Sequence, residues 1–407
     1  MAVLTLYTNN FPYGNSETFL ESEIFYLASS FKSIYILPFE KAAGQRILPE
    51  NVVVLSPVKT EKWSKFSIYL HGFLSVRMLL SNPELRSGLN QTSFLKSVKY
   101  LGYGILTKKN LLKRIILGSD LHYTYWLTYS TFALSLLKKE GIIRNLVSRI
   151  HGYDLYEERG EKGLAFIRPF TVSHLDKLYF ISNHGLNYLR NKIPSYSEKF
   201  NLSRLGSPDP FFTNPVQSND GLVVVSCSVI NKNKRIGLIL GALALFKTKY
   251  PSVSVTWHHI GGGSNLREYI DKTAVMFKES SIDCRFHGQL SNKEVFGFYR
   301  TTGVDIFLNV SESEGIPVSV MEAQSCAIPV AATDSGGITE IVDDENGLIL
   351  KHDLKHDELA EIMYDIYTNK NMWLKKASLS RDFWAKNYSA EKNYSNFAQD
   401  LLLLAKS

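Results

Sequence analysis

Short apolar runs alternate with stretches of helical pattern along the 407 residues of this chain, in two separate series. The first series places apolar runs at 2–8, 33–39, 120–126, 145–152 and 177–183. The second comprises GLVVVSCSV, SVSVTWHHIGGG, IDCRFHG, VDIFLNV, IPVAAT and NGLIL, between residues 221 and 350. Continuous apolar runs that alternate with helices are typical of parallel strands in a sheet covered on both faces. The sequence therefore predicts the α/β class, with doubly wound sheets.

A proline-rich stretch, LGSPDPFFTNPVQSND at 205–220, separates the two series. Such composition is typical of an interdomain linker. We predict a first domain at 1–205, a linker at 206–220 and a second domain at 221–387, followed by a closing helical segment at 388–407. The NFAQDLLLLA pattern in that last segment supplies one apolar face.

The charge of the chain is unevenly placed. Residues 59–117 carry eleven of the 46 Lys and Arg but only two of the 39 Asp and Glu, so this segment has a formal charge of +9 and the rest has −2. Aromatic residues are interleaved with these cations, and such a surface can bind nucleic acid or an anionic membrane leaflet. The alternative is a set of ordinary helices whose Lys stems lie along a core.

The compartment is indicated by what the sequence lacks. Its three cysteines are far apart, the first residues have no signal-peptide pattern, and no stretch approaches the roughly 18 uncharged apolar residues of a membrane span. We expect a cytoplasmic protein.

The densest cluster of chemically useful residues follows the run VDIFLNV. Glu314 and Glu322 flank Gly315 and Pro317 at the start of a predicted helix, where free N–H groups suit an anion. Carboxylates accept hydrogen bonds from sugar or ribose hydroxyls. The alternative is that Glu314 complements the helix dipole and Glu322 is a solvated helix residue. Two further glycine turns, DSGGITEIV and HHIGGGSN, favour a nucleotide-diphosphate pocket.

Residues 221–350 resemble the nucleotide-sugar-binding domain of the retaining GT-B glycosyltransferases with an E-x7-E motif, the glycosyl transferases group 1. The matching motifs are S-C-S at a strand end, Lys234-Arg235, F-H-G at 286–288, E-G-I-P and S-G-G-x-x-E. In the first half, FPYGNSETFLESE resembles the family's first glycine loop and RIHGYDLYEER its His loop. The resemblance implies a GT-B architecture of two Rossmann-like domains facing a cleft, with the closing helix packed on the first domain.

The resemblance also implies roles for individual residues. It makes Glu314, Lys234 and His151 catalytic: Glu314 contacts the transferred sugar, Lys234 neutralises the leaving diphosphate, and His151 approaches the reaction centre. Glu322 would bind the ribose hydroxyls, and the F-H-G segment would lie against the base. The implied donor-binding residues are Glu322, Gly14, Gly315, Ile316, Val318, Ser319, Arg235, Phe286, His287, Gly288 and Gly262. Asp154 would contact the acceptor or orient its loop, and Arg149 would contact the acceptor or pair with Asp154 or Glu157.

One position departs from the family. Val229 stands where an Arg usually precedes the Lys, and Arg235 need not substitute, because neighbours on a helix point about 100° apart. The chain contains no D-x-D, and adjacent His258 and His259 point to opposite faces of a strand. We therefore expect no metal and no cofactor.

These features together predict a retaining transferase that moves a hexose or N-acetylhexosamine from a nucleotide sugar, most readily a UDP-sugar, to a hydroxyl of a polysaccharide or polyprenyl-linked acceptor. Residues 59–117 would dock it on the inner face of an anionic membrane. The alternatives are a sugar-nucleotide epimerase or hydrolase of the same fold, a non-catalytic nucleotide-sugar-binding homologue, and a nucleic-acid-binding protein, which only the charge favours.

Overall fold

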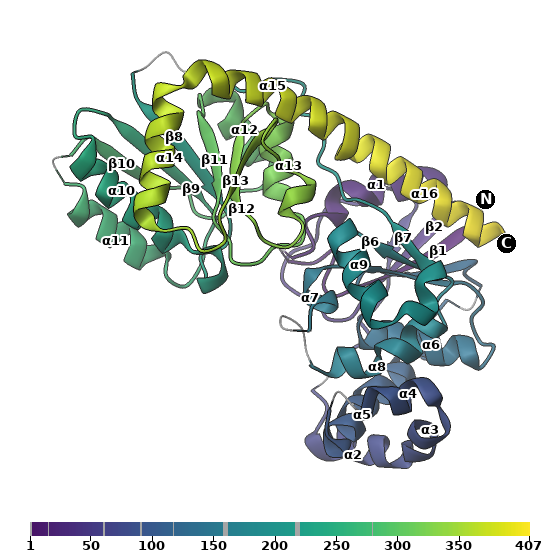
Figure 1. Ribbon diagram of the computed structural model, residues 1–407. Helices are drawn as coiled ribbons and strands as arrows, with labels where there is room; N and C mark the ends of the chain where they lie inside the picture. The colour runs from purple at the N-terminus through teal and green to yellow at the C-terminus, as the bar shows by residue number, and fades with distance from the viewer. Residues whose placement is uncertain are drawn as a thin grey trace. The chain divides into compact units, whose positions relative to one another are not determined.

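The computed structural model describes residues 2–14, 16–59, 62–89, 92–116, 118–157, 162–215, 220–278 and 280–407. The chain divides into two compact units (Figure 1). The first unit consists of Met1–Leu205 and Ala390–Ser407, and the second of Gly206–Ser389. The described part of the proline-rich stretch that follows Leu205 therefore belongs to the second unit.

A seven-stranded, wholly parallel sheet forms the first unit, with the order β3-β2-β1-β4-β5-β6-β7. Every side chain of β4 and β5 is buried, including the polar His122, Ser148 and Arg149, so neither strand alternates between a buried and an exposed face. All five predicted strands are confirmed: β1 (Val3–Thr8), β2 (Ser33–Pro38), β4 (Leu121–Thr124), β5 (Leu146–Ile150) and β6 (Lys177–Phe180). The sequence analysis missed the edge strands β3 (Val52–Val54) and β7 (Phe200–Leu202), which are three residues each.

Helices cover this sheet and add a further layer. Those near the sheet are α1 (Leu20–Ser30), α6 (Tyr129–Lys139), α7 (Gly152–Leu155), α8 (Lys162–Ser173), α9 (Asn183–Lys192), the 3₁₀ helix η2 (Pro194–Lys199) and α16 (Ala390–Lys406). Between β3 and β4 the chain forms α2 (Lys65–Leu74), α3 (Val76–Ser81), α4 (Pro83–Gly88) and α5 (Phe94–Leu111). Within this group α5 packs on α6 and α8, α4 packs on α8, α2 packs on α5, and α3 packs on α4 (Figure 1).

The second unit is built on a six-stranded parallel sheet with the order β10-β9-β8-β11-β12-β13. All six predicted strands are confirmed: β8 (Leu222–Cys227), β9 (Val255–Ile260), β10 (Ile282–Phe286), β11 (Ile306–Asn309), β12 (Val330–Thr333) and β13 (Gly347–Leu350). The helices are η3 (Lys232–Lys234), α10 (Ile236–Lys249), α11 (Leu266–Met276), α12 (Asn292–Thr301), α13 (Val318–Ser325), η4 (Ile338–Glu340), α14 (His356–Thr368) and α15 (Lys370–Asn387). Trp257 and Phe246 are fully buried in its core.

The closing helix α16 belongs to the first unit, where it packs on α1. Its apolar face buries Phe397, Leu401 and Ala405 in the same core as Leu20 and Ile24 of α1. Hydrophobic burial along one stripe therefore attaches the end of the chain to its first 205 residues.

Candidate active site

The carboxyl ends of the parallel strands bring Lys234 and Glu314 together in the second unit. Lys234 ends η3, the short helix after β8, and Glu314 lies in the loop after β11. The Lys234 ammonium forms an ion pair with the Glu314 carboxylate. Two residues that are 80 positions apart, both predicted to be catalytic, thus meet at the edge where α/β sheets bind ligands.

Main-chain hydrogen bonds hold the two loops in place. The side-chain amide of Asn233 donates to the carbonyl oxygen of Ser313 at 3.1 Å, and the N–H of Glu312 donates to the carbonyl oxygen of Asn233 at 2.8 Å. Asn231 caps η3 by accepting from the N–H of Lys234 at 3.1 Å. The ion pair therefore stands between two loops that are anchored to each other.

Helix α13 begins directly after this loop, with Pro317 as its N-cap. The first N–H groups of a helix, here those of Val318 and Ser319, have no intrahelical acceptor and carry the positive end of the dipole. Gly315 and Ile316 connect them to Glu314, and the Ile316 side chain is buried. An anion seat and a cation thus adjoin each other at the start of α13.

The glycine pair after β12 supports this loop rather than providing a second anion seat. Residues 338–340 form a single turn of 3₁₀ helix, so the predicted second strand-to-helix anion site is wrong. A Cβ on Gly336 would lie 2.0 Å from the carbonyl oxygen of Glu314, and one on Gly337 would lie 2.5 Å from that of Gly315. The N–H of Gly337 donates to the latter oxygen at 3.0 Å. Both glycines are needed because two backbones touch here.

Glu322 lies inside α13 and is buried. Its carboxyl oxygen accepts a hydrogen bond of 3.0 Å from the side-chain amide of Asn292. Burial raises the pKa of Glu322 to about 8, so at neutral pH this group is mostly protonated. It is therefore no solvated helix residue, and a ligand that favours the charged carboxylate would release its proton.

The loops after β9 and β10 join through the glycine triplet. The N–H of Gly261 donates to the carbonyl oxygen of Gly288 at 2.7 Å. A Cβ on Gly261 would lie 1.9 Å from the carbonyl oxygen of Ser228, whereas one on Gly262 would meet open space. Gly261 is thus required for packing, and Gly262 presents its backbone to an open surface.

The F-H-G segment is partly exposed along its whole length and packs beside the core of the second unit. Phe286 packs edge-on against Trp257 in the core, with ring centroids 5.4 Å apart. His287 stacks on His258, and their Nε2 and Nδ1 atoms are 2.9 Å apart. Phe286, His287 and Gly288 are all partly exposed, so their predicted contacts with the donor stay predictions.

Arg235, the cation next to Lys234, is held mainly by main-chain carbonyls. Its Nε donates to the carbonyl oxygen of Val310 at 2.5 Å and its Nη1 to that of His352 at 2.8 Å. These two nitrogens tie together main-chain segments, whereas the Nη2 of Arg235 has no hydrogen-bond partner among the described residues, so its predicted contact with the donor stays a prediction. Val229 is about half exposed, at 53%.

In the first unit, His151 follows β5 and its ring is buried between two aromatic residues. Its centroid lies 4.6 Å from that of Tyr125 and 4.5 Å from that of Trp126. Burial, reinforced by the charge of Arg149, holds the pKa of His151 well below its usual range, so the imidazole is neutral. Among the described residues, the buried Nε2 of His151 has no hydrogen-bond partner, and an unsatisfied buried nitrogen is costly unless a ligand completes it.

Asp154 orients the His151 loop. One carboxyl oxygen accepts from the N–H of His151 at 2.7 Å and the other from the N–H of Leu127 at 2.6 Å. The side chain is buried, and burial raises the pKa of Asp154 to about 7 even though these N–H groups lower it. Of the two roles predicted for Asp154, the structure favours orientation of the loop over acceptor contact.

Arg149 is a core residue, so its predicted contact with the acceptor is wrong. Its side chain is fully buried and forms an ion pair with Glu23, not with Asp154 or Glu157. The guanidinium also lies over the ring of Phe397, 4.0 Å from its centroid. Side chains of β5 alternate between faces, and that of Arg149 is directed into the core.

The sequence analysis missed Glu17, although it lies within the quoted FPYGNSETFLESE motif. Its carboxylate accepts from three successive main-chain N–H groups, those of Asn9, Asn10 and Phe11, at 2.7–2.9 Å, and from the indole N–H of Trp126 at 2.6 Å. Glu17 therefore shapes the first loop and holds the ring that covers His151. The sequence signal for Glu17 was its place as an acidic residue three positions after Gly14 in the glycine loop.

Gly14, in the same loop, has a φ of +65°. Its N–H donates to the carbonyl oxygen of Ala43 at 3.1 Å, and a Cβ would lie 2.9 Å from that of Ala42. The left-handed backbone and the neighbouring strand connection both require glycine.

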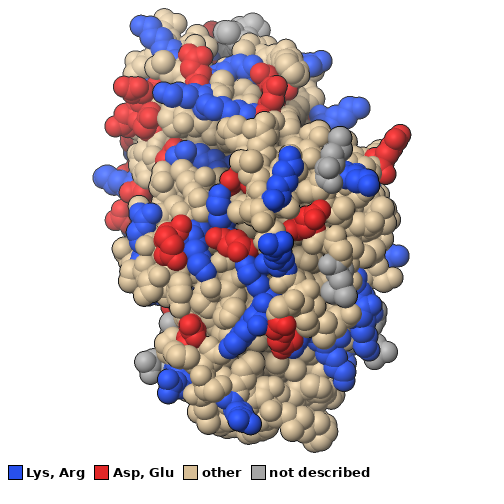
Figure 2. Space-filling model, turned by 90° about the vertical axis from the view of Figure 1, so that its right-hand side faces the viewer, with Lys and Arg blue, Asp and Glu red and all other residues tan. Residues whose placement is uncertain are grey.

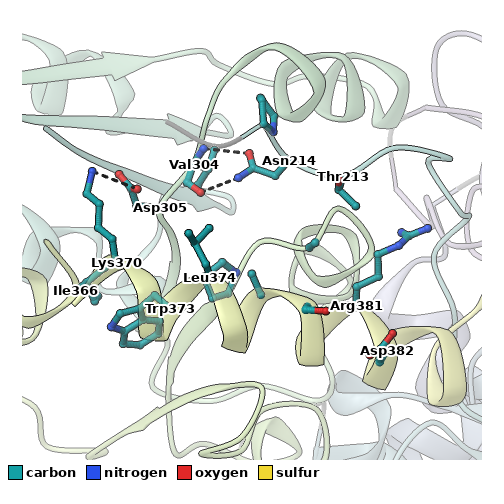
Figure 3. A pocket seen from close by; sticks show the side chains of 15 residues that line it. Thr213, Asn214, Val304, Asp305, Ile366, Lys370, Trp373, Leu374, Arg381 and Asp382 are labelled. Atoms are coloured by element: carbon teal, nitrogen blue, oxygen red, sulfur yellow. Dashed lines mark hydrogen bonds and ion pairs between the residues drawn. The ribbon is translucent and has the colours of Figure 1, made fainter. Parts of the chain in front are cut away.

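A cavity of about 280 Å³ lies elsewhere in the second unit (Figure 3). It is bounded by α15, with Trp373 and Leu374, and by Asn214, whose amide is hydrogen-bonded to the main chain of Val304. Val304 precedes β11, so this cavity is at the amino ends of the strands. It is separate from the Lys234–Glu314 site, which lies at their carboxyl ends.

Comparison with known proteins agrees with this geometry. Residues 211–380, which lie within the second unit, match the family Glycosyl transferases group 1. HepE of Anabaena, solved in complex with UDP and glucose, superposes with a TM-score of 0.68 at 15% identity over 98% of both chains. The lipopolysaccharide outer core galactosyltransferase WaaB superposes with a TM-score of 0.69 at 13% identity over the whole of both chains. The chain therefore has the GT-B fold, as predicted.

The curated relatives align with this chain over only part of their own length. The O-antigen biosynthesis glycosyltransferase WbnH of Escherichia coli is 30% identical over 149 residues, which are 36% of this chain and 40% of WbnH. The putative colanic acid biosynthesis glycosyltransferase WcaL of Salmonella typhimurium is 29% identical over 272 residues, 63% of this chain and 65% of WcaL. Among the described residues, no helix is long and apolar enough to cross a membrane.

Proposed function

We propose that this protein is a retaining glycosyltransferase that moves a hexose or N-acetylhexosamine from a UDP-sugar to a hydroxyl of a polyprenyl-linked or polysaccharide acceptor. The observation that carries the proposal is the Lys234–Glu314 ion pair at the start of α13. A cation, a carboxylate and the free N–H groups at the start of α13 lie within one anchored pair of loops. The match of residues 211–380 to Glycosyl transferases group 1 supports it.

The chemistry assigned to these residues is electrostatic. The bond between the anomeric carbon and the diphosphate breaks, and a bond to the acceptor oxygen forms on the same face. The acceptor proton passes to a leaving phosphate oxygen. Lys234 and the N–H groups of Val318 and Ser319 stabilise the charge that develops on the diphosphate, which is usually the largest contribution in such transfers. Glu314 accepts hydrogen bonds from hydroxyls of the transferred sugar.

Glu322 takes the ribose hydroxyls in this proposal, and His287 lies against the base. The first unit contributes the neutral His151, whose free Nε2 accepts a hydrogen bond from a hydroxyl of the donor sugar. We propose that no metal or other cofactor is needed, because Lys234 and the helix N–H groups supply the positive charge.

We also propose a peripheral location at the inner face of the plasma membrane, where a polyprenyl-linked acceptor is anchored. The +9 charge of residues 59–117 supports it. The neighbours that contain UDP, and the relatives named for O-antigen and colanic acid biosynthesis, favour a role in cell-surface glycan assembly.

The donor is tested first by ligand-induced shifts of the melting temperature with UDP-, GDP- and ADP-sugars. A ligand that binds the native state raises its stability by mass action, so we expect UDP-sugars to give the largest shift. No shift with any nucleotide sugar would contradict the assignment of the second unit.

The site is tested by variants with matched controls. We expect Lys234→Ala and Glu314→Gln to lower the rate of UDP release with acceptor by at least about 100-fold, the range for loss of a charge stabiliser. Lys232→Ala, on the same short helix, and Glu312→Gln, in the same loop, change exposed side chains and should leave the rate unchanged. Wild-type turnover in both site variants would refute the assignment. UDP release that is independent of acceptor would favour a hydrolase.

A further inference from the structure

Helix α2 has an apolar stripe on its outer face. Phe66, Leu70, Phe73 and Leu74 follow the spacing i, i+4, i+7, i+8, which places them on one side of a helix. Their exposed fractions are 77%, 42%, 50% and 75%. We call these four residues the α2 stripe. Single exposed apolar residues are ordinary in soluble proteins, but a continuous row of them is not.

The packing of α2 explains why the stripe is exposed. The inner face of α2 buries only Ile68 and Gly72, and α2 crosses α5 at very close range. A Cβ on Gly72 would lie 2.0 Å from the carbonyl oxygen of Val98, and one on Gly102 would lie 1.9 Å from that of Ile68. Because small residues make this crossing, the large apolar side chains of α2 are left facing outward.

The charged residues within α2 and α3 are all cations, although Glu61 and Glu84 border this stretch in the sequence. Residues 62–83 contain Lys62, Lys65 and Arg77 and no Asp or Glu, and all three cations are exposed. Elsewhere in the basic segment, Lys59 is paired with Glu40 and Lys108 with Glu140, so the net charge of the segment overstates what is available there. Figure 2 shows Lys and Arg side chains over the lower part of the face in view, at the level of α2–α5 in Figure 1.

We propose that the α2 stripe inserts into the surface of an anionic lipid bilayer. The inference builds on the peripheral location proposed above, but it assigns binding to apolar side chains that take no part in the donor site. A helix with an exposed apolar face and flanking cations lies in the plane of the interface, with its apolar side among the acyl chains and its cations at the anionic headgroups. The inserted side chains supply affinity, and the cations supply the preference for anionic lipid.

A second copy of this chain is the other candidate occupant. A symmetric dimer through the stripe would bring the same surface of both copies together, so Lys62, Lys65 and Arg77 would face their own counterparts. Like charges across an interface oppose association. An anionic bilayer would bury the apolar side chains and attract the cations beside them. A dimer would bury the apolar side chains but bring the cations together.

The experiment measures co-sedimentation of the full chain with vesicles of phosphatidylcholine, with and without phosphatidylglycerol. The variant Phe66→Gln/Phe73→Gln/Leu74→Gln keeps good helix formers and should bind mixed vesicles at least about tenfold more weakly than wild type. The control Ile47→Gln/Val275→Gln/Leu403→Gln removes three apolar side chains of similar exposure elsewhere, at 91%, 80% and 69%, and should bind like wild type.

A second variant, Lys62→Gln/Lys65→Gln/Arg77→Gln, separates the two contributions. We expect it to lose the preference for phosphatidylglycerol while keeping residual binding that salt does not weaken. Equal vesicle binding by wild type and the stripe variant would overturn the proposal. So would a wild-type dimer that the stripe variant converts to monomer while vesicle binding is absent in both.

UDP-induced melting shifts keep this test distinct from the proposed function. The stripe variant should show the wild-type shift, because α2 carries none of the donor-site residues. Absence of any UDP effect in wild type, with vesicle binding intact, would contradict the transferase assignment alone. A normal UDP effect without vesicle binding would contradict the membrane surface alone.

Discussion

The buried carboxyl of Glu322 predicts that UDP binds more tightly as the pH rises from 6 to 8. Burial raises the pKa of Glu322 to about 8, and the proposed ribose contact favours the charged carboxylate. At pH 6 the group is about two pKa units below its midpoint, and each unit corresponds to about 1.4 kcal/mol. Ionising it for the ligand therefore costs up to about 3 kcal/mol, which weakens UDP binding by up to about 100-fold.

The assay is isothermal titration calorimetry of UDP between pH 6 and 9, with Glu322→Gln as the control. The amide keeps an acceptor oxygen but does not titrate, so subtraction of its profile removes the titration of the UDP phosphate. Below pH 8, wild type should also release up to one proton per UDP, seen as a heat that depends on the ionisation enthalpy of the buffer. Parallel pH profiles for wild type and variant would refute the reasoning.

The remaining predictions concern stability and the glycine turns. Because the folded-state pKa of Glu322 lies above its ordinary 4.5, the native state keeps a proton that the unfolded chain has lost, so unfolding free energy falls between about pH 4.5 and 8; wild type should lose melting temperature against Glu322→Gln over that window. Arg149→Met leaves the buried carboxyl of Glu23 without its ion-pair partner and should cost about 3–5 kcal/mol in denaturant unfolding, with Glu23→Gln/Arg149→Met restoring most of it. Gly336→Ala should lower both melting temperature and UDP affinity, since its Cβ would lie 2.0 Å from a carbonyl oxygen. Gly262→Ala should leave the melting temperature unchanged, because a Cβ at this position would meet open space. A large loss of stability would contradict the packing described.

The sequence alone determined the two α/β units and indicated where along the chain the candidate donor site lies. Eleven of the described strands carry enough apolar and β-branched residues to be recognised in the sequence, because most of their side chains are buried in a parallel sheet. The residues after those runs lie at one edge of each sheet, which is why Glu314, Lys234 and Glu322 could be selected before their contacts were known. Only β3 and β7, with three residues each, were too short for such a pattern.

Tertiary structure decided what each selected side chain touches. Arg149 and Arg235 are of a residue type that often binds anionic ligands. In the structure, however, Arg149 is paired with Glu23 in a core and Arg235 donates to main-chain carbonyl oxygens. Glu17 and the glycine pair at 336–337 act on loops distant in sequence. Apolar periodicity is a local property and survives in the sequence, whereas the partner of a charge, the burial that shifts a pKa and the exposure of the α2 stripe depend on which segments folding brings together.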